Sequence, residues 1–134
     1  MTSTHPTLQW SETEPAAEVL TGEQLDQRLD QLARSARGDF PISVRLQMHG
    51  CEADILLGLP GSFVYVNELA ARREYITVGD SRSEGVVSFY LLGQRHTEFE
   101  RRCLIPLAAA RRVLREFFDT GRRSPTVEWE ERWY

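Results

Sequence analysis

Residues 105–129 read IPLAAARRVLREFFDTGRRSPTVEW, and this stretch predicts a helix followed by a strand. Pro106 suits the first position of a helix, where its missing N–H costs no hydrogen bond, and Gly121 suits a left-handed C-terminal cap. Pro125 then ends the helical pattern, and Val127 and Trp129 alternate with polar residues as in a half-buried strand. Between the two ends of the helix, apolar residues recur at three- and four-residue spacing and mark one buried face: Leu107, Ala110, Val113, Leu114, Phe117 and Phe118. The segment therefore predicts a helix that packs back onto a sheet.

Several short motifs of this segment occur together in a fixed order. They are Ile105-Pro106, an alanine-rich helix that ends in Glu116-Phe117-Phe118, then Thr120-Gly121, an arginine, a proline and Val127-x-Trp129. In this order they resemble the Imm1 family of bacterial immunity proteins, which neutralise partner toxins of polymorphic toxin systems. No residue of the pattern is catalytic, so the resemblance implies a function in binding.

The first third of the chain predicts a second helix. Thr21 and Gln24 have the spacing of a capping box, in which each residue satisfies a free backbone N–H at the helix start. Gly38 and Pro41 mark the end of this helix. Its apolar face is predicted to consist of Leu25, Leu29, Leu32, Ala33 and Ala36. Residues 1–20 suit either a short edge strand followed by a loop or a mobile arm.

The middle of the chain changes to a period of two, which is typical of strands. Pro60-Gly61 predicts a type II turn between two of these strands, because such a turn favours proline and then glycine at its central positions. The predicted strands are 42–48, 53–59, 62–66, 75–78 and 86–92. Together these elements predict a single α+β domain over residues 1–134. It has two layers, an antiparallel β-sheet meander with two α-helices packed on one face.

Composition narrows the range of functions. All 16 basic side chains are arginine, which excludes phosphate-loop, Schiff-base and restriction-type nuclease sites that require lysine. The net charge of −4 disfavours direct binding of nucleic acid and favours a basic protein partner. Residues 1–10 contain no apolar run, and no run in the sequence is long enough for a membrane span. We therefore expect a soluble, cytoplasmic protein without a signal peptide and with free thiols at Cys51 and Cys103.

Metal and enzyme sites are the first alternatives to a binding function. His49, Cys51, His96 and Cys103 carry the usual zinc-ligand atoms, but their spacing matches no closed zinc site. A Cys51 nucleophile with a histidine base lacks an orienting acid and an oxyanion hole. We therefore predict no catalytic, cofactor-binding or metal-binding residues.

Alternation along the strands predicts what each face of the sheet carries. The helix-covered face should take Ile55, Leu57, Val64, Val66, Ile76, Val78, Val87, Phe89 and Leu91. The open face should gather Tyr65, Tyr75 and Tyr90, joined by Glu128 and Glu130 if the last strand belongs to the same sheet. Tyrosines supply large rigid contact areas at recognition surfaces, although another part of the chain covering them explains the same pattern. An interface at the end of the sheet would instead use the loop that contains Asp80 and Glu84.

These observations favour an immunity protein that binds and neutralises a cognate toxin by stoichiometric inhibition. A basic nucleic-acid deaminase or nuclease fits the acidic charge of this chain. The immunity protein itself is expected to be a monomer or weak dimer. A small-molecule-binding or enzymatic α+β domain is the main alternative, and it requires a convergent polar cluster in a closed pocket. A structural subunit is a third, and it requires a permanent apolar interface.

Overall fold

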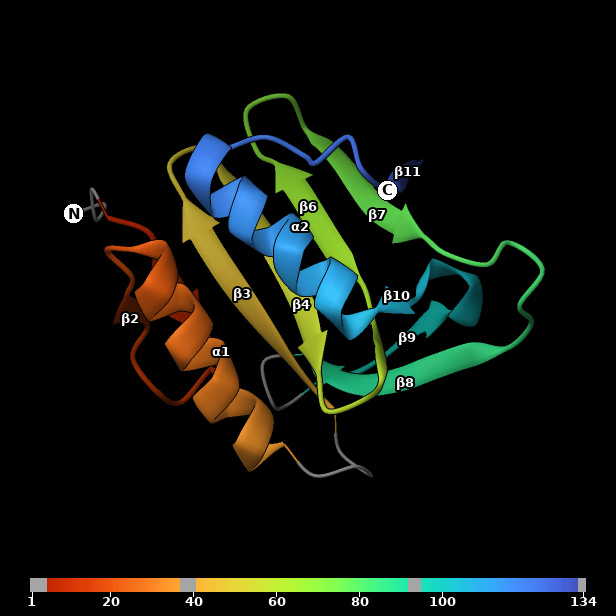
Figure 1. Cartoon of the computed structure of the whole chain (residues 1–134), viewed down its shortest axis with the longest axis horizontal. Coiled ribbons are helices and arrows are strands. Elements are labelled where there is room, and N and C mark those ends of the chain that lie inside the picture. Colours follow the sequence, from red (N-terminus) through yellow and green to blue (C-terminus); the bar gives the residue numbers. More distant parts are fainter. Residues whose placement is uncertain (1–4, 37–40, 92–94, 133–134) are drawn as a thin grey trace.

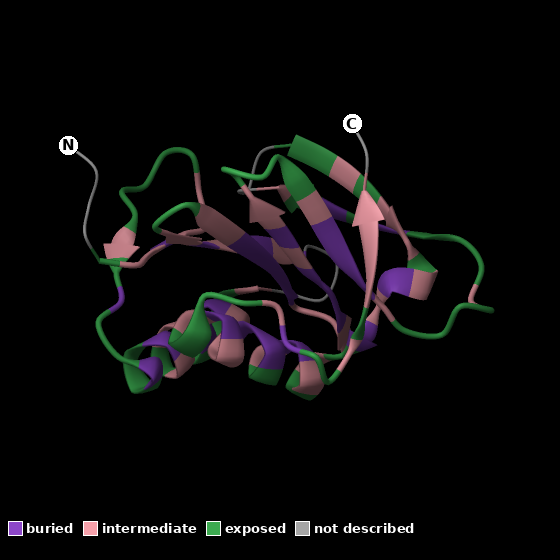
Figure 2. Cartoon of the chain, turned by 90° about the horizontal axis from the view of Figure 1, so that it is seen from above, coloured by how far each residue is buried: buried purple, intermediate pink, exposed green. Residues whose placement is uncertain are grey.

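The computed structural model describes residues 5–36, 41–91 and 95–132. Within these ranges, α1 (Gly22–Ser35) and α2 (Leu107–Thr120) form one layer, and a mostly antiparallel sheet forms the next (Figures 1 and 2). This arrangement confirms the predicted α+β class with two helices on one face of the sheet. Neither helix combines the length and the apolar composition needed to cross a membrane.

In the main sheet, four strands from the middle of the chain lie side by side in chain order, as in a meander. The strands on either side of these four come from the two ends of the chain. The order of the sheet is β11 (Glu128–Arg132), β7 (Arg73–Val78), β6 (Val64–Glu68), β4 (Cys51–Leu57), β3 (Ile42–Met48), β1 (Thr7–Gln9) and β2 (Ala17–Glu18). In the described part of the N-terminal region, β1 pairs antiparallel with β3 on one side and with β2 on the other, so β2 lies at this edge of the sheet. Residues 1–4, Gly38 and Leu92, to which some of the predicted boundaries extend, lie outside the described residues.

The fifth predicted strand does not lie beside the fourth. β8 (Val86–Leu91) meets β3 at one parallel pair, Ile42 with Tyr90, and β11 occupies the position next to β7. β8 instead pairs over its whole length with β9 (Arg95–Glu100), a strand that the sequence did not predict. The two form the β8–β9 hairpin, which runs across one end of the sheet (Figure 1).

The predicted type II turn at Pro60-Gly61 is wrong. That turn requires a positive φ at Gly61, whereas the positive φ in this connection belongs to Gly58, at 111°. Gly61 lies in β5 (Gly61–Ser62), which pairs with β10 (Ile105–Pro106) directly before α2. The backbone oxygen of Pro60 also accepts a hydrogen bond of 3.0 Å from the N–H of Leu107. The connection between β4 and β6 therefore takes the conformation that fixes the start of α2.

The start of α1 and the end of α2 follow the capping signals in the sequence. Thr21 Oγ1 accepts a hydrogen bond from the Gln24 N–H at 3.1 Å, while Gln24 Oε1 accepts from the N–H of Leu20. The second bond is displaced by one residue from an ideal capping box. At the other helix, Gly121 has a left-handed φ of 72°, and its N–H donates to the Phe117 oxygen at 2.7 Å. α2 begins at Leu107, directly after the predicted first position at Pro106.

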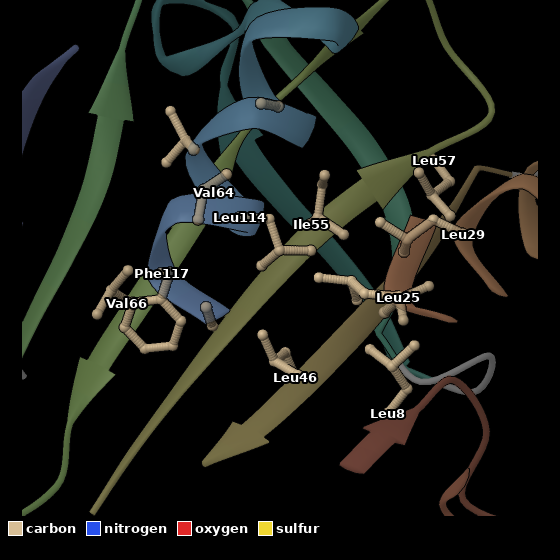
Figure 3. Packing of buried hydrophobic residues seen from close by; sticks show 14 of the residues in the cluster. Leu8, Leu25, Leu29, Leu46, Ile55, Leu57, Val64, Val66, Leu114 and Phe117 are labelled. Atoms are coloured by element: carbon tan, nitrogen blue, oxygen red, sulfur yellow. The ribbon is translucent and has the colours of Figure 1, made fainter. Parts of the chain in front are cut away.

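The main core lies between the helices and the sheet. Side chains of α1 and α2 pack against alternate residues of β1, β3, β4 and β6 (Figure 3). The residues labelled there are Leu8, Leu25, Leu29, Leu46, Ile55, Leu57, Val64, Val66, Leu114 and Phe117. Val127 and Trp129 pack at the margin of this core. The predicted apolar faces of both helices thus supply its helical side, except for Ala36, which follows the end of α1 and does not join this core.

Ion pairs connect the two helices at the solvent side of this core. Arg111 Nη1 lies 2.6 Å from Asp30 Oδ1, and Arg115 Nη1 lies 2.7 Å from Asp26 Oδ2. The guanidinium of Arg115 also fills the space beside Gly22, where a Cβ would lie 2.0 Å from Nε. Glycine at this position allows α1 to begin directly against the arginine of α2.

A second core lies on the face of the sheet opposite the helices, which we call the far face. Its buried members are Leu56, Phe63, Ile76, Val87, Phe89 and Cys103. Four residues predicted to face the helices belong to the far-side core or pack against it, namely Ile76, Val87, Phe89 and Leu91. The register explains the difference for β7, because Ile76 pairs with Tyr65 and Tyr75 pairs with Val66. The β8–β9 hairpin explains the other three, since it packs on one end of the far face.

Two adjacent phenylalanines of α2 allow a test of which face of this helix packs against the main core. Phe117 is 1% exposed, whereas Phe118 is only partly buried. We expect Phe117→Ala to lower the free energy of unfolding by ~3–5 kcal/mol, because it removes a ring and leaves a cavity. Phe118→Ala should cost clearly less. Urea unfolding of both variants measures the difference, and equal losses would contradict the assigned helix orientation.

Candidate partner-binding surface

The three tyrosines predicted to share an open face lie in three different environments. Tyr65, in β6, lies on the far face and stacks on Phe99, with ring centroids 5.5 Å apart and planes at 13°. Tyr75, in β7, lies on the helix side and is 9% exposed. Tyr90, in β8, is 38% exposed and lies edge-on to His96. The prediction that these side chains form one surface is therefore wrong.

Tyr75 is covered by an arginine from the loop after α2. Arg123 Cζ lies 3.6 Å from the centroid of the Tyr75 ring and 5.7 Å from that of Trp129. A guanidinium over aromatic rings is attracted by their electron-rich faces. The Trp129 Nε1–H also donates to the Ser124 oxygen at 2.8 Å. These contacts give Tyr75 a role in packing the loop between α2 and β11 against the sheet.

The two predicted glutamates of β11 share a face but differ in their contacts. Glu128 and Glu130 pair with Val78 and Ile76 of β7, so both project from the far face as predicted. Glu128 is exposed. Glu130 accepts hydrogen bonds from Arg102 and lies 3.5 Å from Arg132 Nε. Glu130 is thus partly neutralised within the protein.

Arg132 extends this network to the end of β9. Its two terminal nitrogens donate to the carboxylate of Glu100 at 2.9 and 2.7 Å. The bidentate hydrogen bonds from Arg132 lower the pKa of Glu100 to about 2, although burial opposes the shift. Since Glu100 ends β9 and Arg132 ends β11, the pair connects the β8–β9 hairpin to the edge of the main sheet.

The predicted loop acids lie at one end of the hairpin. Asp80 and Glu84 are exposed in the loop between β7 and β8. Asp80 Oδ1 accepts a hydrogen bond of 3.0 Å from the N–H of Arg82, which orders the loop locally. Val86, the next strand residue, is 49% exposed. The register puts the following residues together on the outer face of the hairpin: Val86, Ser88, Tyr90, His96, Glu98 and Glu100.

The half of the far face that the hairpin leaves uncovered is polar. Cross-strand pairing and alternation place one set of residues there, which we call the polar floor: Arg45, Glu52, Asp54, Asn67 and Glu74. Arg45 donates to both oxygens of Asp54, at 2.8 and 3.1 Å. Burial raises the pKa of Asp54, and the hydrogen bonds from Arg45 oppose that shift. The floor carries three carboxyl groups and one guanidinium.

A cleft of about 420 Å³ separates the polar floor from the β8–β9 hairpin. The sheet side contributes Ser43, Arg45, Asp54, Phe63, Tyr65 and Glu74. The hairpin side contributes Phe89, Leu91, Thr97, Glu98 and Phe99. Aromatic rings therefore form the walls of the cleft, and charged groups lie at its floor and rim. Of these residues, only Tyr65 is among the partner-binding residues predicted from the sequence.

The potential metal ligands do not converge. Cys51 packs beside the helix-side core and Cys103 lies in the far-side core, so the sheet separates them. Burial raises the pKa of both thiols, which favours the protonated form. Among the described residues, no group of three or more histidine, cysteine, aspartate or glutamate side chains is placed to hold a metal ion.

The pair of Glu100 and Arg132 predicts a specific pH dependence. A carboxyl group with a lowered pKa contributes stability above its ordinary value of 4.5, and that contribution is lost as the pH falls through about 2. Because the pair is partly exposed, we expect Glu100→Gln to cost only about 1 kcal/mol at pH 7. Urea unfolding should show this difference shrinking between pH 5 and pH 2.

Glu98→Gln is the matched control, because Glu98 is an exposed glutamate of the same strand and makes no ion pair within the described residues. It should leave stability unchanged across the same pH range. A loss for Glu100→Gln that does not depend on pH would show that the charge of Glu100 is not what stabilises the hairpin.

Comparison with known proteins identifies the family. No curated protein matches the sequence significantly. The model of the immunity protein Imm1 family matches residues 14–131, a range that includes both helices and most of the strands. The chain therefore belongs to the Imm1 family of immunity proteins.

Proposed function

We propose that this protein binds a cognate protein toxin and neutralises it by stoichiometric inhibition, without catalysis of its own. The observation that carries the proposal is the match to the Imm1 family over residues 14–131. The sequence supports it further, because it contains no set of nucleophile, base and orienting group. In this proposal residues 1–134 act as one domain, as a monomer or weak dimer, in the bacterial cytoplasm.

The toxin is proposed to be a basic, nucleic-acid-acting protein of a polymorphic toxin system, either a deaminase or a nuclease. Such enzymes present cationic clefts for phosphate groups, and an acidic protein is attracted to them. The chain has a net charge of −4. On the far face, register places five acids against two arginines, Arg45 and Arg132. The acids are Glu52, Asp54, Glu74, Glu128 and Glu130. This excess of negative charge supports the far face as the side that meets the toxin.

We place the interface on the hairpin-side surface, which consists of the polar floor, the cleft, Glu128 of β11, the outer face of the β8–β9 hairpin and the 79–85 loop. Four of the predicted partner-binding residues are exposed and remain candidates for direct contact: Tyr90, Glu128, Asp80 and Glu84. Tyr65 contributes as a wall of the cleft. Tyr75 and Glu130 contribute indirectly, because Arg123 covers the first and Arg102 binds the second.

A small-molecule-binding domain is the second candidate function, and the cleft is the observation that favours it. Aromatic walls around a few polar groups are typical of ligand pockets. Two of those polar groups, Arg45 and Asp54, already satisfy each other through two hydrogen bonds. The pair is therefore less available to a small ligand than two separate polar groups would be, and we rank this function second.

Association and dissociation rates of the toxin complex should distinguish residues that make apolar contact from residues whose charge speeds association. Tyr90→Ala should raise the dissociation rate, with a loss of ~2 kcal/mol or more if the ring is a hot spot, largely independent of salt. Replacing Asp80 and Glu84 by Asn and Gln should slow association instead. That effect should shrink at high salt, because exposed charges are screened beyond ~10 Å. The measurement is binding kinetics against the toxin encoded in the adjacent reading frame, at low and high salt.

Two variants on other surfaces serve as controls. Leu20→Ala removes an apolar side chain that is 55% exposed before α1, and Glu116→Gln removes a charge from α2. Neither should change either rate, and all variants should unfold at the wild-type urea concentration. If the control variants weaken binding while the hairpin variants do not, the toxin binds the helices and the proposed surface is wrong.

A further inference from the structure

We propose that the cleft between the polar floor and the β8–β9 hairpin receives an arginine side chain of the toxin. The inference rests on the proposed function and assigns one contact within it. Three features of the cleft support a guanidinium as the occupant. They are an aromatic wall, a carboxylate that has no partner among the described residues, and the pairing of Arg45 with Asp54 at the floor.

The aromatic wall is ordered by its own packing. Phe99 stacks on Tyr65 at 5.5 Å and meets Phe63 edge-on, with centroids 5.0 Å apart and planes at 86°. Tyr65 and Phe99 are half-buried, so part of each ring faces the cleft, while Phe63 is 1% exposed behind them. A guanidinium is planar and weakly hydrated, and it stacks on such faces more readily than an ammonium group does.

Glu74 supplies the available negative charge. It lies in β7 on the far face, where it pairs across the strands with Asn67 and Arg132. Among the residues that the structure describes, its carboxylate makes no hydrogen bond or ion pair, and its neighbour Arg132 is held by Glu100 and Glu130. A half-buried carboxylate in this position can accept two parallel hydrogen bonds from an arginine.

The charge at the floor does not repel a cation. Arg45 is the one basic residue in the described lining, and both oxygens of Asp54 accept its hydrogen bonds. Glu52 adds a further carboxylate 3.9 Å from Arg45 Nε. With Glu98 at the rim, the cleft and its surroundings are net negative. Charge complementarity therefore selects a cationic side chain, and the stacked aromatic wall selects arginine over lysine.

The first experiment uses a small probe and does not require the toxin. N-acetyl-arginine methylamide is titrated into the ¹⁵N-labelled full chain, with the uncharged isostere N-acetyl-citrulline methylamide as the comparison. We expect saturable shifts of the Tyr65, Glu74 and Phe99 amides with the arginine probe, with a dissociation constant of about 1–50 mM, in the range of a single weak contact. The citrulline probe should bind at least threefold more weakly.

Two variants test whether Glu74 binds the guanidinium of the arginine probe. Glu74→Gln should weaken the arginine probe at least threefold, while Glu128→Gln, which removes an exposed glutamate outside the cleft, should leave it unchanged. Equal binding of arginine and citrulline, equal binding of a lysine probe, or the absence of saturable shifts at these amides would overturn the proposal. Stronger binding of citrulline would instead indicate a neutral ligand site.

The second experiment uses the toxin and separates this inference from the proposed function. Glu74→Gln should raise the dissociation rate of the toxin complex at least tenfold, and Glu116→Gln, which removes a charge from α2 outside the proposed surface, should change it less than threefold. If the toxin binds and neither variant matters, the arginine contact is wrong and the proposed function stands. If the wild-type protein fails to bind the toxin, the proposed function is wrong, and the probe titration still decides whether the cleft binds a guanidinium.

Discussion

The structure depends on the burial of β4 on both faces of the sheet. Residues 53–57 are all buried, although successive side chains of a strand point to opposite sides. Ala53, Ile55 and Leu57 enter the helix-side core, whereas Leu56 enters the far-side core. Two helices can cover only one face. The apolar residues on the other face require a second cover, and the β8–β9 hairpin provides it.

The hairpin covers only one end of the far face, and the binding surface follows from that partial cover. Where it packs, Phe89 and Val87 bury Leu56 and Ile76. Beyond its edge, the same strands carry polar side chains, because the alternation of β4, β6 and β7 continues with Glu52, Asn67 and Glu74. The cleft forms at this boundary between apolar and polar halves. An aromatic wall next to acidic groups is therefore a consequence of how the sheet is covered.

Capping residues and the spacing of apolar residues predicted those elements whose ends and buried faces depend on neighbouring residues in the sequence. Pro106, Gly121 and the helical periodicity between them define α2, and strict alternation defines β3, whose bounds agree with the prediction. The register of β7 was not predictable in this way. Tyr75 and Ile76 are both apolar enough to be buried, and the residue that covers Tyr75, Arg123, is distant in the sequence. β9 was missed because its sequence, RHTEFE, carries one large apolar residue, Phe99.

The candidate site was predictable only in its general character. An acidic and aromatic far face follows from alternation, and Glu128, Glu130 and Tyr65 do lie on it. The pair of Arg45 with Asp54 gave no sequence signal, because strand pairing brings these two residues opposite each other across nine positions of the chain. The partner of Glu130 is equally nonlocal, since Arg102 reaches it from the turn after β9.

The central claim is that the toxin binds the hairpin side of the sheet and leaves the helices exposed. Hydrogen exchange of the protein, alone and in its complex with the toxin, tests this most directly. The account predicts slower exchange in residues 73–78, 79–91 and 95–100 on binding, with no change in the exposed turns of α1 and α2. Protection confined to residues 22–35 and 107–120 would contradict it.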